Sequence, residues 1–139
     1  MGITFTIEKN TNMRVLLADD SNLILERLQE ALSIYKQVEI VGLCGNGIET
    51  LEAIRTLKPD LAIIDIKMPG LTGIEVLQEI RKESKSPKIV ILTFYSSDYY
   101  QQVAIKFGAD YFYSKVDDFE KIPQLVSSML KYENDYNEA

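Results

Sequence analysis

"LAIIDIKMPGLTG", residues Leu61 to Gly73, decides the fold of this chain. The stretch begins as an apolar run typical of a buried strand, ends that run on the carboxylate of Asp65, and then reaches Pro69 and Gly70, which favour a turn. Burying an isolated charge is costly. Asp65 therefore either reaches solvent at the strand end or is held there for its chemistry, and the rest of the sequence has to distinguish the two.

The composition indicates one compact, acidic domain. The chain has 139 residues, 46% of them hydrophobic, which suffices for one core but not for two full domains. A net charge of −6 offers no electrostatic basis for binding nucleic acid or an anionic membrane. No apolar run approaches the roughly 18 residues of a membrane helix and no signal-peptide pattern is present, so we expect a cytoplasmic protein.

Two residue types limit the chemistry. The absence of histidine excludes a histidine base and a zinc-type ligand cluster. Cys44 is the single cysteine, so the chain cannot form an intramolecular disulfide. We expect Cys44 to be a small, semi-buried residue of a strand.

Five short apolar runs alternate with five helical patterns. The runs are rich in β-branched or aromatic residues and have the length of strands: "MRVLLA", "VEIVGL", "LAIID", "KIVILT" and "YFYS". They are almost continuously apolar, which is typical of parallel strands that are covered on both faces. The intervening segments repeat apolar residues at helical spacing: Ile24, Leu28, Ala31, Leu32 and Tyr35 after Ser21; Ile48, Leu51, Ile54 and Leu57; Val76, Leu77 and Ile80; Tyr100, Val103, Ala104 and Phe107; Phe119, Ile122, Leu125, Val126, Met129 and Leu130.

This alternation predicts an α/β fold. With right-handed crossovers it gives a three-layer sandwich, and five strands favour the flavodoxin-like sheet order 2-1-3-4-5. We predict a domain over residues 13–131 between an N-terminal arm, 1–12, and a polar, frayed C-terminal tail, 132–139. The arm contains "ITFTIEKN", which alternates like a half-buried strand. The first strand is expected inside the sheet and cannot take this segment as a hairpin partner, so we expect a mobile arm or an addition to the sheet edge.

Polar side chains follow the predicted strands where each one ends. Asp19 and Asp20 follow the first strand, Asp65 ends the third, and Thr93 and Lys115 stand at the ends of the fourth and fifth. In open α/β sheets these carboxyl ends form the ligand site. Three carboxylates about 4 Å apart repel by about 4 kcal/mol per pair at an effective dielectric constant near 20, so the cluster requires a cation. Oxygen ligands favour Mg²⁺, and a carboxylate beside Mg²⁺ with a hydroxyl and an ammonium suits an aspartyl-phosphate acceptor.

The chain resembles the receiver domain of two-component response regulators from Met13 to Leu130. The resemblance rests on four motifs in family order: "LLADDSN", "LAIIDIKMPGLTGIEVL", "ILTFYS" and "GADYFYSK". It implies a phosphorelay protein that takes a phosphoryl group from a phosphohistidine on a sensor histidine kinase or a histidine phosphotransfer protein. It also implies that the chain is not an enzyme, beyond catalysing its own phosphorylation and dephosphorylation.

The same resemblance implies the role of each site residue. Asp65 would be the nucleophile that accepts the phosphoryl group. Asp20 and Asp65 would bind Mg²⁺ directly, Asp19 would act mainly through water, and the backbone carbonyl of Lys67 would complete the protein ligands. Lys115 would pair with the phosphoryl oxygens.

Thr93 and Phe112 would form the switch. Phosphorylation adds about −1.5 to −2 charge, so Thr93 would move to bind a phosphoryl oxygen and Phe112 would turn inward. The surface formed by the fourth helix, the fifth strand and the fifth helix would then change. This surface is a candidate for a downstream protein target or a homodimer, because amphipathic tyrosines gather there: Tyr95, Tyr99, Tyr100, Tyr111 and Tyr113.

Three positions depart from the family pattern. Val116 replaces a proline after Lys115, which leaves the geometry of that loop open. Phe94 stands where a small residue is commoner; its ring either restricts access to the phosphoryl group or packs in the core. Phe112 lacks a tyrosine hydroxyl and, as a pattern, equally fits an ordinary strand residue.

Several functions compete with one another. We expect a stand-alone phosphoacceptor switch, since the polar tail leaves no room for an output domain before Ala139. The alternative is the N-terminal receiver half of a longer DNA-binding transcription regulator. An Asp-x-Asp phosphatase is disfavoured because Lys67 stands where its second acid would be, and a flavin-binding domain because "ADDSN" would repel a phosphate. A last alternative is a degenerate receiver that never accepts a phosphoryl group. The presence of Asp65, Thr93 and Lys115 argues against it.

Overall fold

The computed structural model describes the backbone of residues 12–138 and the side chains of residues 12–131. Its five strands form one parallel sheet in the order β2-β1-β3-β4-β5, as predicted. The strands are β1 Met13–Ala18, β2 Val38–Cys44, β3 Leu61–Ile64, β4 Lys88–Thr93 and β5 Tyr111–Ser114. The helices are α1 Asn22–Leu32, α2 Gly47–Leu57, α3 Gly73–Glu83, α4 Asp98–Lys106 and α5 Lys121–Glu138.

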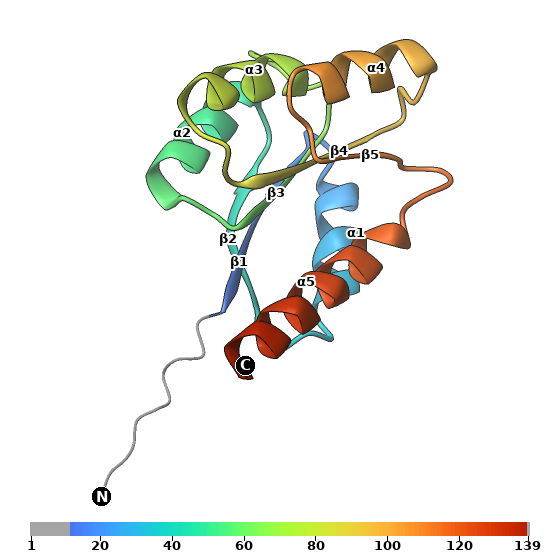
Figure 1. The fold of residues 1–139 in the computed structure, drawn as a ribbon. Coiled ribbons are helices and arrows are strands. Elements are labelled where there is room, and N and C mark those ends of the chain that lie inside the picture. The colour runs from blue at the N-terminus through green and yellow to red at the C-terminus, as the bar shows by residue number, and fades with distance from the viewer. Residues whose placement is uncertain (1–11, 139) are drawn as a thin grey trace, which may run out of the picture.

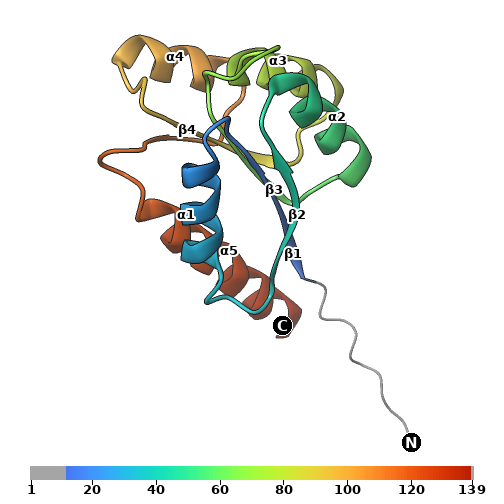
Figure 2. The same ribbon diagram turned by 180° about the vertical axis from the view of Figure 1, so that it is seen from behind.

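The helices cover both faces of the sheet. α2, α3 and α4 lie on one face and α1 and α5 on the other (Figure 1), and Figure 2 shows the same layers from behind. Side chains alternate along each strand between two separate cores, so that Leu16 and Ile64 face α2 and α3 while Leu17 and Ile63 face α1 and α5. This arrangement confirms the predicted three-layer α/β sandwich.

Local capping explains where the helices begin. Ser21 accepts a hydrogen bond from the Ile24 N–H and so caps the start of α1. Thr72 and Glu75 form a capping box at the start of α3, directly behind the turn that follows Asp65. Local hydrogen bonds therefore fix where both helices start. These starts position the loops at the carboxyl edge of the sheet.

Some sequence predictions need correction or lie outside the described residues. Ile48 was expected on the buried face of α2, but it is exposed, because the buried face of the first turn is formed by Gly47 and Thr50 instead. The domain boundary at residue 131 stays a prediction, and α5 runs across it from Lys121 to Glu138. Cys44 ends β2 and is buried, and burial raises the pKa of its thiol. The predicted arm, apart from Asn12, lies outside the described residues.

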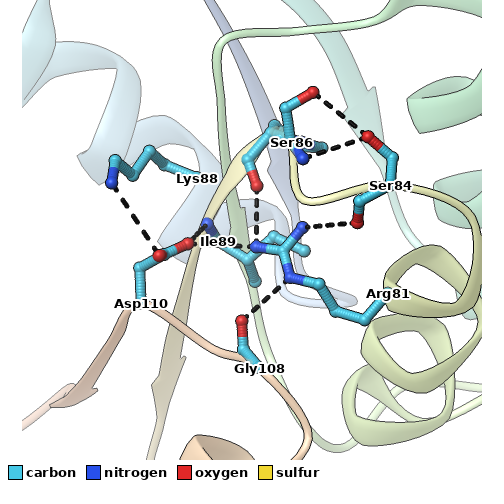
Figure 3. A network of polar contacts seen from close by, with 8 residues as sticks. Arg81, Ser84, Ser86, Lys88, Ile89, Gly108 and Asp110 are labelled. Carbon is cyan, nitrogen blue, oxygen red and sulfur yellow. Dashed lines mark hydrogen bonds and ion pairs between the residues drawn. The ribbon is translucent and has the colours of Figure 1, made fainter.

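The amino-terminal edge of the sheet is closed by a polar network around Arg81 (Figure 3). From the last turn of α3 its guanidinium donates to the carbonyls of Gly108 and Pro87 at 2.9 and 2.8 Å. It also pairs with Asp110 at 3.0 Å, and Asp110 accepts the backbone N–H of Ile89 at 2.8 Å. This edge is thus tied together by hydrogen bonds, and the charged cluster described next lies at the opposite edge.

Candidate functional site

The sheet register brings the carboxylates of Asp19 and Asp65 to one point. Ala18 at the end of β1 pairs with Ile64 at the end of β3, and each strand is followed directly by its aspartate. The Asp65 N–H donates to the Ala18 carbonyl at 3.0 Å, so the alignment continues past the last strand residues. Both side chains are buried, at 2% and 6% exposure.

Asp20 completes an acidic cluster. One carboxylate oxygen from each of Asp19, Asp20 and Asp65 lies within 4.8 Å of the others. Asp20 is exposed, unlike its two partners, so the cluster opens to solvent on its side. The structure therefore brings together the three carboxylates that the sequence predicted.

Lys115 reaches this cluster from the end of β5. Its ammonium lies 2.6 Å from Asp19 Oδ2 and 3.0 Å from Asp65 Oδ2, and its side chain is only 3% exposed. One ammonium thus bridges two buried carboxylates, which reduces the repulsion between them. The bridge brings a fourth predicted residue to the site, from a strand that does not touch β1 or β3.

The protonation of Asp19 reflects this crowding. Burial raises its pKa above the usual range, and the nearby charge of Asp65 acts in the same direction. The hydrogen bonds that Asp19 accepts from Lys115 and from the Ser21 N–H oppose the rise. The effect of burial outweighs these hydrogen bonds, so the ionised form of Asp19 is less stable in the folded protein than it would be in water.

The backbone fixes the orientation of Asp65. Its Oδ1 accepts the N–H of Ile66 at 2.7 Å, which leaves Oδ2 directed at Lys115. Behind it, Gly73 lies so close that a Cβ atom there would stand 2.1 Å from the Asp65 carbonyl oxygen. The glycine therefore allows α3 to start against the strand end that carries Asp65.

Thr93 lies at the end of β4, which separates β3 from β5. The residue is completely buried, its Oγ1 accepts the N–H of Tyr95 at 3.0 Å, and its carbonyl accepts the N–H of Lys115 at 2.9 Å. The side chain of Thr93 is therefore linked to the β4–α4 loop, and its carbonyl is linked to Lys115, the residue that bridges the carboxylates.

The remaining predicted residues lie around the cluster. The exposed Lys67 ammonium stands 5.0 Å from the centre of the Tyr95 ring. Phe112 is half-buried in β5 and packs against the core between the sheet and α2, α3 and α4. Phe94 is 59% exposed, which rules out the alternative that it packs in the core.

Sequence reasoning missed how the Lys115 loop is held without a proline. The hydroxyl of Ser114 accepts the N–H groups of Val116 and Asp117 at 3.1 and 3.2 Å. Asp118 in turn accepts the Ser114 N–H at 2.9 Å. The serine and aspartate in "SKVDD" favour such turns, and this is the signal that could have revealed them.

The fold and site define a class: a flavodoxin-like α/β domain with acidic, hydroxyl and ammonium groups at the carboxyl edge of its sheet. The chain belongs to the response regulator receiver domain family, whose pattern matches residues 15–135. The general function of this family is phosphorelay signal transduction. Within residues 12–138 no helix has the length and apolar character that crossing a bilayer requires.

Three similar proteins illustrate the family. A protein-glutamate methylesterase/protein-glutamine glutaminase of Methanospirillum hungatei JF-1 is 36% identical over 115 residues, 81% of this chain and 34% of that protein. The transcriptional regulatory protein YvfU of Bacillus subtilis is 30% identical over 119 residues, 86% of this chain and 60% of that protein. The signal receiver domain of NarL from Mycobacterium tuberculosis has a TM-score of 0.78 at 29% identity, over 87% of this chain and 98% of that chain.

The chain is shorter than these two curated relatives, since it spans 34% of one and 60% of the other. The shared part is the receiver domain. The methylesterase activity named for the first relative is a property of that whole protein.

Proposed function

We propose that Asp65 is the phosphoacceptor of this receiver domain. The observation that carries the proposal is the Asp65 carboxylate at the end of β3, 3.0 Å from the buried Lys115 ammonium and beside Asp19. In the transfer, the bond between phosphorus and the donor's imidazole nitrogen breaks, leaving its electron pair on that nitrogen. A bond from phosphorus to an Asp65 carboxylate oxygen forms. Lys115 neutralises charge on the phosphoryl oxygens, and the hydroxyl of Thr93 donates to one of them.

The residues present fit a magnesium ion. The cluster of Asp19, Asp20 and Asp65 offers only oxygen ligands within 4.8 Å of one another, and it carries more negative charge than Lys115 alone balances. Asp20 and Asp65 would hold the ion, Asp19 would act mainly through water, and the Lys67 carbonyl would complete the protein ligands. Bound there, Mg²⁺ would supply charge neutralisation at the phosphoryl oxygens.

Exposed apolar side chains around the site suit a protein donor. Leu23 at the start of α1, Ile48 at the start of α2 and Val116 after Lys115 are exposed although each is apolar. All three lie in or next to loops at the carboxyl edge of the sheet. We assign this rim to the sensor histidine kinase or histidine phosphotransfer protein that delivers the phosphoryl group.

The expected output is a changed surface on α4, β5 and α5. Movement of Thr93 toward the phosphoryl group would pull the β4–α4 loop through the Tyr95 N–H, and Phe112 would turn inward. This surface would bind a downstream protein or a second copy of the chain. The only reactions that the chain would catalyse are its own phosphorylation and dephosphorylation.

A second candidate is the receiver half of a longer DNA-binding regulator. It is supported by the transcriptional regulator YvfU, of which this chain matches 60%. The site chemistry would be the same, and the changed surface would then contact an attached output domain.

The phosphoacceptor assignment can be tested by mass. Incubation with acetyl phosphate and Mg²⁺ should add one phosphoryl group to the wild type and none to Asp65→Asn, which keeps the size of the side chain. Asp117→Asn is the matched control, since this exposed aspartate lies outside the acidic cluster, and it should still accept the group. An adduct that persists in Asp65→Asn would refute the assignment.

A further inference from the structure

The Phe94 ring lies over the one ammonium of the site. The Lys115 Nζ stands 4.9 Å from the ring centre, and the same nitrogen contacts Asp19 and Asp65 at 2.6 and 3.0 Å. An ammonium has three N–H donors. The Lys115 ammonium therefore pairs with two carboxylates and also has an aromatic ring within cation–π distance.

Phe94 itself has no place in either core. It is 59% exposed, whereas Thr93, the residue before it, is completely buried. An exposed phenyl ring gains little from packing, but over a cation it gains the attraction between the positive charge and the ring's negative face. This contact accounts for an exposed ring being held over the buried Lys115 ammonium.

The ring therefore borders the position of a phosphoryl group on Asp65. Under the proposed function, the phosphoryl oxygens contact Lys115 and the hydroxyl of Thr93. Phe94 adjoins both groups, since it follows Thr93 in the chain and overlies the Lys115 ammonium. An apolar ring at this position limits the approach of water to the phosphorus.

We propose that the Phe94 ring shields the aspartyl phosphate from water and lengthens its lifetime. The inference rests on the proposed function of Asp65. In the step that is slowed, a water oxygen bonds to phosphorus and the bond between phosphorus and the Asp65 oxygen breaks. Its electron pair returns to the carboxylate, and orthophosphate leaves while the proton from water passes to phosphate or solvent.

The first experiment measures dephosphorylation. Each protein is loaded with acetyl phosphate and Mg²⁺, freed of the donor, and followed by intact mass. Phe94→Ala should lose its phosphoryl group severalfold faster than the wild type, because the ring no longer limits the approach of water to the phosphorus. Phe94→Tyr keeps the ring and should restore the slow rate. Tyr99→Ala removes an exposed ring on α4 outside the site and should leave the rate unchanged.

The second experiment measures how strongly the Phe94 ring shields Lys115 in the unphosphorylated protein. Acetic anhydride labelling, mapped by peptide mass, should modify Lys115 faster in Phe94→Ala than in the wild type, while the exposed Lys121 reacts equally in both. Equal Lys115 labelling, or equal lifetimes in proteins that carry the adduct, would overturn the shield alone. Failure of the wild type to form any adduct would overturn the proposed function, and the lifetime inference with it.

Discussion

Lys115 balances the charge of the site at the scale of single residues. It is the ammonium that contacts both Asp19 and Asp65, and all three side chains are almost completely buried. Removing one member of a buried ion pair leaves an uncompensated charge, which is more costly than never having formed the pair. Lys115 therefore stabilises the metal-free protein, and it also determines how much negative charge of the cluster remains for a bound cation.

Lys115→Met should destabilise the protein by about 3 kcal/mol in the presence of a chelator, because it leaves two buried carboxylates unpaired. Magnesium should recover more stability in the variant than in the wild type, since the ion then replaces the missing positive charge. Thermal unfolding with EDTA and with Mg²⁺ measures both effects. An equal stabilisation by Mg²⁺ in the two proteins would contradict this account of the cluster.

The members of the site could be predicted from sequence, but their pairing could not. Asp19, Asp20, Asp65 and Lys115 each stand at the end of a recognisable strand, so the sheet topology alone predicts that they meet. That Lys115 bridges Asp19 and Asp65, and that Phe94 turns outward over it, depends on loop dihedral angles. No periodic pattern in the sequence encodes these angles.

At the scale of elements, the start of α3 packs closely against the end of β3, where Asp65 lies. Gly73→Ala would place a Cβ atom 2.1 Å from the Asp65 carbonyl oxygen, so backbone has to shift. We expect a loss of about 1–3 kcal/mol, as for other overpacked sites, with a displaced Asp65. Gly45→Ala is the matched control, because no atom lies within 4 Å of its added Cβ. Urea unfolding of both variants measures the difference, and equal midpoints would contradict the expectation.

The β5–α5 loop should respond to acid through Asp118. The hydrogen bond from the Ser114 N–H lowers the pKa of Asp118, and the hydrogen bond from Lys121 adds to the effect. A carboxyl whose pKa is lowered by folding stabilises the fold above its ordinary value of about 3.9 and loses that contribution as the pH falls through its folded value. Asp118→Asn should therefore be less stable than the wild type at pH 7, and the gap should narrow below pH 4.

Unfolding by denaturant at a series of pH values tests this pH dependence. The side chain of asparagine keeps an acceptor for the Ser114 N–H, so the comparison isolates the charge. A gap of constant size from pH 7 to pH 3 would show that the charge of Asp118 contributes nothing.

The last helix shows why the end of α5 could not be predicted from the sequence. The segment after residue 131 was expected to fray because it is polar and acidic, yet α5 continues to Glu138. Polar residues alone do not end a helix, and no glycine or proline, the strongest helix breakers, occurs after Pro123.

At the scale of the whole molecule, the surface on α4 and β5 is the strongest candidate for pairing. Tyr99, Ile105 and Tyr111 are exposed at 69%, 49% and 36%, and exposed aromatic and apolar side chains are favoured at protein interfaces. The phosphorylated wild type should elute earlier from size exclusion than the unmodified protein, and the double variant Tyr99→Ser, Ile105→Ser should not. Identical elution of modified and unmodified wild type would exclude a homodimer driven by phosphorylation.

The network around Arg81 has a mechanical consequence for the same surface. The segment after α4 is held at Gly108 and Asp110 by Arg81, while the start of α4 follows the loop that bears Phe94 and Tyr95. A helix anchored at its far end and pulled at its near end pivots about the anchor. Displacement would then grow along α4 from Lys106 toward Asp98, so Tyr99 would move farther than Ile105.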